Sequence, residues 1–222
     1  MHVPAQLVNA PILFIAWAMA TLAFVVALRR ANWRALALDP RRLHLVGGGA
    51  VGCLLLWLMN IHLVDGVVLH FLGVTTLTLV VGWSLTILGA SLALIGFFAL
   101  QGLDWASLGL SLCLSIVVPA SLTRILVHWL YRPKLRHPFV YILGAGFAGG
   151  GLVVLSLSLI AVLLFWIAGL DAYVASAAEW WPLIFLVMFS EGFLNGMCVS
   201  ALAVFHPDWV KTYDDRFYLN GT

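Results

Sequence analysis

Long apolar stretches fill most of this 222-residue sequence, and most of the few charged residues stand in the short connections between them. A helix needs about 20 mainly apolar residues to cross the hydrocarbon core of a bilayer. Only 9% of the residues are charged, whereas an ordinary soluble domain has about 25%. No soluble fold of this length could hide the 64% that are hydrophobic, so lipid must solvate much of the chain. We therefore expect an all-α polytopic membrane protein.

The apolar stretches predict a compact bundle of about seven transmembrane helices in a single domain covering residues 1–222. The stretch over 66–100 is too long for one helix, and we expect it to divide near Gly82-Trp83-Ser84 at a tight turn. The expected spans are about 10–28, 43–61, 66–82, 84–100, 106–129, 139–170 and 181–205, after an N-terminal segment of residues 1–9.

The basic residues fix the expected orientation of the bundle. When the chain is threaded through seven spans, all eleven Lys and Arg residues fall on one side. The connections on the other side carry Asp65, Asp104, Asp171 and Glu179 and no basic residue. The positive-inside rule makes the basic side cytoplasmic. We therefore expect an N-terminus outside and a C-terminus in the cytoplasm, in a bacterial inner membrane.

The first 28 residues do not resemble a cleaved signal peptide. The segment Met1–Gln6 has no positive charge, and the arginines follow the apolar run instead of preceding it. We expect these residues to remain on the mature protein, with Met1 kept because the large His2 side chain disfavours its removal.

His2 places three nitrogen donors at the start of the chain: the amine of Met1, the backbone nitrogen of His2 and its imidazole. These donors close fused chelate rings in one plane and leave one position for another imidazole. Square-planar nitrogen coordination is typical of Ni(II) and Cu(II), which can drive deprotonation of a backbone amide. Residues 1–9 reach up to about 30 Å when extended, so the segment can fold back onto the bundle.

His70 is the expected partner of His2. Three of the seven histidines, His2, His62 and His70, are expected on the outer side. Because His70 follows Asp65 by five residues, it is predicted roughly 7 Å below the outer end of its helix, at a depth that suits a pocket wall. A buried imidazole needs a partner, and a metal ion is one such partner.

Glu191 and Asn195 lie four residues apart and so on one face of the last expected helix. Glu191 is about ten residues beyond Trp181, roughly 15 Å into the membrane. An acidic residue at that depth is functional or paired inside the bundle. Two interpretations stay open, an additional metal ligand and a hydrogen bond to a neighbouring helix. Possible partners are Thr75, Thr76 and Thr78.

Pairs of glycines four residues apart predict close helix packing. The pairs are Gly48 and Gly52, Gly146 and Gly150, and Gly192 and Gly196. Each pair forms a small-xxx-small face on which another helix backbone can approach closely.

Met1-His2-Val3-Pro4 resembles the Met-His-Ile-Pro start of the CbiM/NikM-type substrate-capture subunits of cobalt and nickel energy-coupling-factor (ECF) transporters. His70-Phe71-Leu72-Gly73 is similar to their His-Leu-Leu-Gly, and Gly82-Trp83 to the Gly-Pro-Trp that follows. Ala5 and Gln6 stand where the family usually has Asp-Gly. The resemblance covers most of the chain, as a divergent branch.

The resemblance implies that the N-terminal segment plugs the bundle. It also implies that nickel or cobalt is held by the terminal amine, by the amide and ring of the second residue, and by a further histidine. In this sequence the implied metal ligands are Met1, His2 and His70. The residues themselves add His62, Glu191 and Asn195 as further candidate ligands. Because the chain has no phosphate-binding loop, ATP hydrolysis would belong to partners, a coupling transmembrane subunit and cytoplasmic ATPases.

Other interpretations of the histidines remain open. A membrane redox protein could hold haem between His44 and His128, which are both expected near the cytoplasmic face. A copper-binding subunit or a metal-free accessory membrane subunit is also compatible with the sequence. We expect a transport component and not an enzyme, and no nucleic-acid partner.

Overall fold

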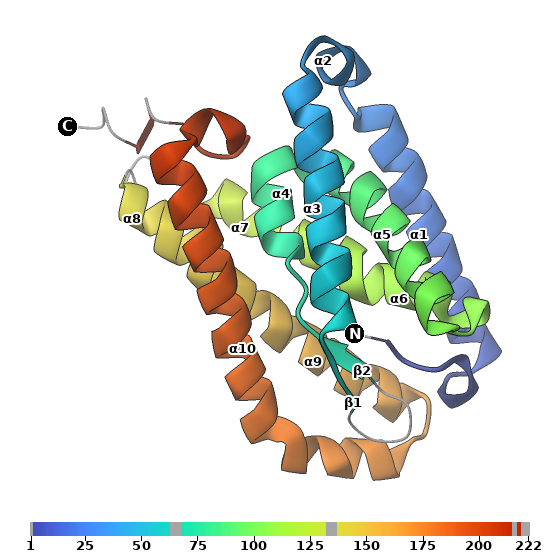
Figure 1. The fold of residues 1–222 in the computed structure, drawn as a ribbon. Coiled ribbons are helices and arrows are strands. Elements are labelled where there is room, and N and C mark those ends of the chain that lie inside the picture. The colour runs from blue at the N-terminus through green and yellow to red at the C-terminus, as the bar shows by residue number, and fades with distance from the viewer. Residues whose placement is uncertain (1, 63–67, 132–136, 215–216, 219–222) are drawn as a thin grey trace.

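The computed structural model describes residues 2–62, 68–131, 137–214 and 217–218. It is an all-α polytopic bundle with one small hairpin (Figure 1). By length and composition, five helical stretches of these residues could cross a membrane. They are Ala10–Arg30, Trp83–Gln101, Trp105–Leu130, Pro138–Ile167 and Glu179–Phe205.

The first two expected spans correspond to helices α1 (Ala10–Arg30) and α3 (Pro40–Leu58), which are joined through the short α2 (Trp33–Leu38). α3 begins and ends about three residues before the expected span over 43–61. Its start is set by Pro40 in the first turn and by Asp39, whose side chain accepts a hydrogen bond from the Arg41 N–H at 3.1 Å. The arginines in this first turn keep α3 out of the set that could span by composition.

The expected helix over 66–82 is wrong. β1 (Asn60–His62) and β2 (Val68–His70) form an antiparallel hairpin in which Asn60 lies opposite His70. Among the described residues of that region, 68–82, only α4 (Val74–Val81) is helical, and its eight residues are too few to cross a bilayer. His70 therefore lies on a strand and not one turn below a helix end. The physical reason is Gly73, whose φ of +64° starts α4 from a left-handed conformation.

The helix break expected near Gly82 is present. α4 ends at Val81 and α5 (Trp83–Gln101) begins at Trp83, with Gly82 between them at φ +84°. A Cβ on Gly82 would lie 2.9 Å from Cδ of Lys211, so the lysine stem crosses directly over this glycine. The tight turn thus requires glycine for its backbone conformation and for its close neighbour.

The next two expected spans each combine several helical types. The expected span over 106–129 consists of four successive elements: η2 (Trp105–Ser107), α6 (Leu108–Leu112), η3 (Cys113–Val117) and α7 (Val118–Leu130). The expected span over 139–170 consists of three: α8 (Pro138–Val140), η5 (Tyr141–Ala148) and α9 (Gly149–Ile167). η3 and η5 are π-helical, a form that occurs mostly as local insertions in α-helices.

The last helix is longer than expected. α10 covers Asp171–Phe205, ten residues more at its start than the expected span over 181–205. Pro182 lies inside it, and a proline kinks a helix because its ring displaces a backbone hydrogen bond. Figure 1 shows the orange start of α10 crossing the bottom of the molecule before the helix turns upward.

The short helix α4 lies in the middle of the bundle, between α3 and α10 (Figure 1). It packs against α3, α5, α7 and α10, and seven of its eight residues are buried. The N-terminal segment and the hairpin lie at one end of the bundle. α2 and η6 (Pro207–Trp209) lie at the opposite end.

Two of the three glycine pairs pack as expected. A Cβ on Gly146 would lie 3.2 Å from Cα of Gly196, and one on Gly150 would lie 3.2 Å from Cα of Gly192. The η5–α9 helix and α10 therefore meet backbone to backbone. The expectation for Gly48 and Gly52 is wrong, because a Cβ on either would meet nothing within 4 Å.

Gly192→Ala should lower the melting temperature of the detergent-solubilised protein, since its Cβ would lie 2.6 Å from the carbonyl oxygen of Phe147. Forced overpacking of this kind costs about 1–3 kcal/mol. Gly47→Ala is the matched control, because its Cβ would meet nothing within 4 Å and alanine favours the helix. Equal melting temperatures for the two variants would contradict the close approach of η5–α9 and α10.

Candidate metal centre

The N-terminal segment is docked inside the bundle. Val3 and Val8 belong to the buried core, in the same cluster as Ala16 of α1 and Leu72. Between them, Ala5–Leu7 form the short 3-10 turn η1. The buried apolar side chains hold the segment against the helices and bring His2 into the interior.

The His2 side chain is buried, with 5% of its surface exposed. Its Nδ1 shares a hydrogen bond of 3.2 Å with Oγ of Ser111 in α6. Its ring meets Phe98 of α5 edge to face, with 5.4 Å between the ring centroids. An aromatic wall and one hydroxyl therefore fix the orientation of this imidazole.

The His70 side chain is also buried, with 4% of its surface exposed. Its ring packs against both Trp57 and Phe97, with centroid distances of 5.6 and 5.9 Å. Phe97 and Phe98 are neighbours in α5, so the two histidines pack against adjacent aromatic residues. The structure thus brings residues 2 and 70 to the same region of the bundle.

Both imidazoles are neutral at neutral pH. Burial lowers the pKa of His2 to about 4, and the positive N-terminus contributes in the same direction. Burial likewise lowers the pKa of His70 well below its ordinary value. Nδ1 of His70 lies 2.9 Å from the carbonyl oxygen of Phe71, and the tautomer that donates this bond carries its lone pair on Nε2. Neutral imidazoles held by backbone carbonyls are the usual form of metal-ligating histidine.

Glu191 holds the backbone that follows His70. Its side chain is fully buried, and the N–H of Leu72 and the N–H of Gly73 donate to its two carboxylate oxygens at 2.8 and 2.9 Å. Gly73 is the residue that starts α4, so the carboxylate lies at the positive end of this helix. Charge-assisted bonds of this kind are about twice as strong as neutral ones.

Asn195 completes this clamp one turn further along α10. Its Nδ2 donates to the Glu191 carboxylate at 2.8 Å, and its Oδ1 accepts from the N–H and hydroxyl of Thr76 at 2.9 and 2.6 Å. The hydrogen-bond interpretation of this pair therefore has an observed partner in Thr76. On the other side of the chain, the indole N–H of Trp57 donates to the carbonyl oxygen of Leu72 at 3.1 Å.

The remaining candidate ligands are less constrained. Met1 lies outside the described residues. His62 lies on β1, where it pairs with Val68, and its side chain is outside the described part of the structure. Within the residues described, no three or more His, Cys, Asp or Glu side chains form a group that could hold a metal ion. Of the candidate ligands, the structure brings the imidazoles of His2 and His70 to this place.

The aromatic residues around the two histidines escaped prediction from the sequence. Trp57, Phe97 and Phe98 stand in apolar runs where nothing separates them from ordinary core residues. Ser111 is one of several serines in the helical stretch Trp105–Leu130. The Trp57 indole could have been noticed as a buried donor that requires an acceptor.

Glu191→Gln should destabilise the protein in detergent by roughly 1–3 kcal/mol, because an amide cannot accept both backbone N–H bonds and leaves one donor buried without an acceptor. Glu179→Gln, on the exposed start of the same helix, is the matched control and should change little. Thermal denaturation of both variants measures the difference. If Glu191→Gln melts no lower than Glu179→Gln, the clamp does not hold the segment.

Two solved structures share this fold. "Crystal Structure of an transition metal transporter" matches with a TM-score of 0.74 at 17% identity, over 92% of this chain and 93% of that chain. "Crystal Structure of an Truncated Transition metal Transporter" matches with a TM-score of 0.72 at 15% identity, over 94% and 99%. No curated protein sequence matches significantly.

A protein family of metal-uptake components matches almost the whole sequence. The family is CbiM, described as "Cobalt uptake substrate-specific transmembrane region", and the match covers residues 2–209. That range includes His2, the His70–Gly73 segment and the Glu191 clamp. This membrane protein therefore belongs to the CbiM family of cobalt-uptake substrate-specific transmembrane proteins.

Proposed function

We propose that this metal-uptake component captures nickel or cobalt, and that Met1, His2 and His70 hold the ion. The amine of Met1, the amide and ring of His2 and the ring of His70 would supply four nitrogens. The observation that carries the proposal is the burial of both imidazoles against adjacent aromatic residues of α5. Copper has the same coordination preference and remains a second possible substrate.

The surroundings of the two histidines support a water-poor nitrogen site. Trp57, Phe97 and Phe98 are buried aromatic residues that cover the imidazoles. Such a shell keeps water from competing for the open coordination positions. No acidic cluster suited to a harder ion occurs in the described part of the chain.

Glu191 and Asn195 have a positioning role in this proposal and are not ligands. Both carboxylate oxygens accept backbone N–H bonds, and the Asn195 carbonyl oxygen accepts two bonds from Thr76. These bonds fix the backbone immediately after His70. The His70 ring then faces the N-terminal segment in one orientation. This lowers the entropic cost of ordering the ligands when the ion binds.

Uptake would require movement of the N-terminal segment. The ion would bind near the outer face, with the N-terminus outside and the C-terminus cytoplasmic in a bacterial inner membrane. Energy for release would come from a coupling transmembrane subunit and cytoplasmic ATPases. His2, Val3 and Val8 hold the segment in the bundle, with Leu7 packed against the same cluster, and these contacts would have to break for the segment to leave.

The metal content of the purified protein, loaded with Ni(II) or Co(II) at neutral pH, tests the proposal. We expect about one ion per chain in the wild type. His2→Ala and His70→Ala should each bind at least about 100-fold more weakly, because losing a ligand costs more than losing one of its outer partners. His44→Ala removes an exposed histidine from α3 and serves as the control. Equal metal content in all four proteins would contradict the site, and a Soret band would favour the haem interpretation.

A further inference from the structure

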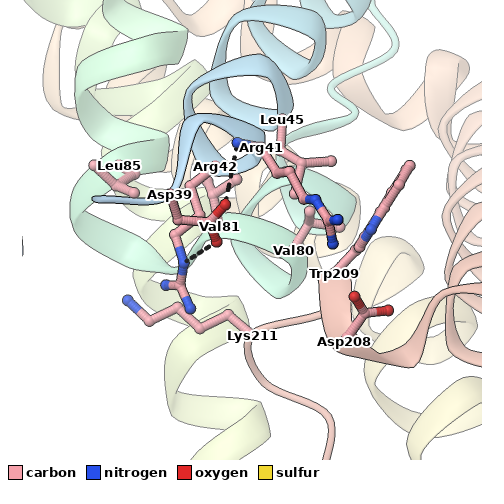
Figure 2. A pocket seen from close by; sticks show the side chains of 10 residues that line it. All are labelled: Asp39, Arg41, Arg42, Leu45, Val80, Val81, Leu85, Asp208, Trp209 and Lys211. Atoms are coloured by element: carbon pink, nitrogen blue, oxygen red, sulfur yellow. Dashed lines mark hydrogen bonds and ion pairs between the residues drawn. The ribbon is translucent and has the colours of Figure 1, made fainter. Parts of the chain in front are cut away.

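A second pocket lies at the end of the bundle opposite the metal centre. Figure 2 shows it between the start of α3, the end of α4 and the segment after α10. It has a volume of about 70 Å³ and contains the basic side chains of Arg41, Arg42 and Lys211. Asp39, Asp208 and Trp209 complete its polar wall.

Positive charge in this pocket exceeds the negative charge available to balance it. The Asp39 carboxylate accepts from the Arg41 N–H at 3.1 Å and pairs with Arg42 Nε at 3.4 Å, as the dashed lines of Figure 2 show. That is the one ion pair within the described residues, so Lys211 and the Arg41 guanidinium have no ion-pair partner there. The pKa of Lys211 is lowered by burial and by the nearby Arg42 and Arg124.

Lys211 is held in place by its backbone and its stem. Its N–H donates to the carbonyl oxygen of Val80 at 3.0 Å, and the N–H of Thr212 donates to that of Leu79 at 3.2 Å. The aliphatic stem lies over Gly82, where no side chain obstructs it. The chain therefore holds Lys211 among other cations, and an anion bound there would reduce the Coulombic repulsion between them.

An apolar groove begins where the basic pocket ends. The groove runs between α3, α4 and α10, has a volume of about 500 Å³ and has an almost wholly apolar wall. Leu45 and Val80 line both the pocket and the groove, so the two cavities share a wall. Gly52 of α3 lines the groove, and a Cβ there would meet nothing within 4 Å.

We propose that this pocket and groove together bind one anionic phospholipid, with the phosphate among Arg41, Arg42 and Lys211 and an acyl chain along the groove. A basic pocket beside an apolar groove matches a ligand with an anionic head and a hydrocarbon tail. Basic pockets between transmembrane helices bind such headgroups. A helix of a partner protein would use the apolar groove but would leave the cations at its mouth without an anion.

Native mass spectrometry of the full-length protein in detergent tests this proposal with phosphatidylglycerol and phosphatidylcholine of identical acyl chains. We expect the wild type to retain one phosphatidylglycerol in preference to phosphatidylcholine. The double variant Arg41→Gln/Lys211→Gln should bind phosphatidylglycerol about 30-fold more weakly, because each basic residue near a headgroup contributes about fivefold. Arg29→Gln/Arg34→Gln removes the same charge outside the pocket and should change binding less than about threefold.

The groove is tested separately with Gly52→Leu, which should reduce retention of both lipids by filling the acyl-chain site. Gly47→Leu adds the same bulk to α3 outside the groove and should leave retention unchanged. Metal loading serves as the folding control for all four variants. The proposal would be overturned if the two double arginine and lysine variants weakened lipid binding equally. It would also be overturned if inorganic phosphate alone displaced the lipid, or if Gly52→Leu retained as much lipid as the wild type.

Discussion

The buried Glu191 carboxylate determines the geometry at the centre of this bundle. In a bilayer, an unpaired backbone N–H costs several kcal/mol, and the left-handed start of α4 exposes two such groups, those of Leu72 and Gly73. Glu191 accepts both bonds and thereby ties α10 to α4. These two residues are separated from His70 only by Phe71, so the bonds that the fold needs also constrain the position of the candidate metal ligand.

α4 connects the two sites of the molecule. At its start it is held by Glu191 and Asn195 of α10, and at its end the N–H groups of Lys211 and Thr212, just beyond α10, donate to its last carbonyls. The glycines that bracket it, Gly73 and Gly82, both have positive φ. A helix of eight residues could not span a membrane alone, and it is stable here because surrounding helices bury seven of those residues.

Much of the fold follows from local sequence patterns. The helix break at Gly82 and the close approach of Gly146–Gly150 to Gly192–Gly196 were predictable because each depends on a few neighbouring residues. The hairpin before α4 was not, since an apolar run predicts burial without distinguishing helix from strand. The conformation of Gly73 is stabilised by a carboxylate 118 residues away, which no local pattern contains. The candidate site also has a predictable part and an unpredictable part. His2 and His70 were suggested by their sequence contexts. Trp57 and Phe98 could be recognised as site residues only from the three-dimensional structure.

If Met1, His2 and His70 hold the ion, nitrogen atoms alone coordinate it. X-ray absorption spectroscopy of the nickel-loaded protein tests this directly. We predict a square-planar site with four nitrogen neighbours and no sulfur. The informative alternative is Cys53, whose Sγ would lie 3.6 Å from a Cβ on Gly73 and is therefore the thiol beside the His70 segment. Sulfur scattering, or a six-coordinate oxygen shell, would contradict the proposed site.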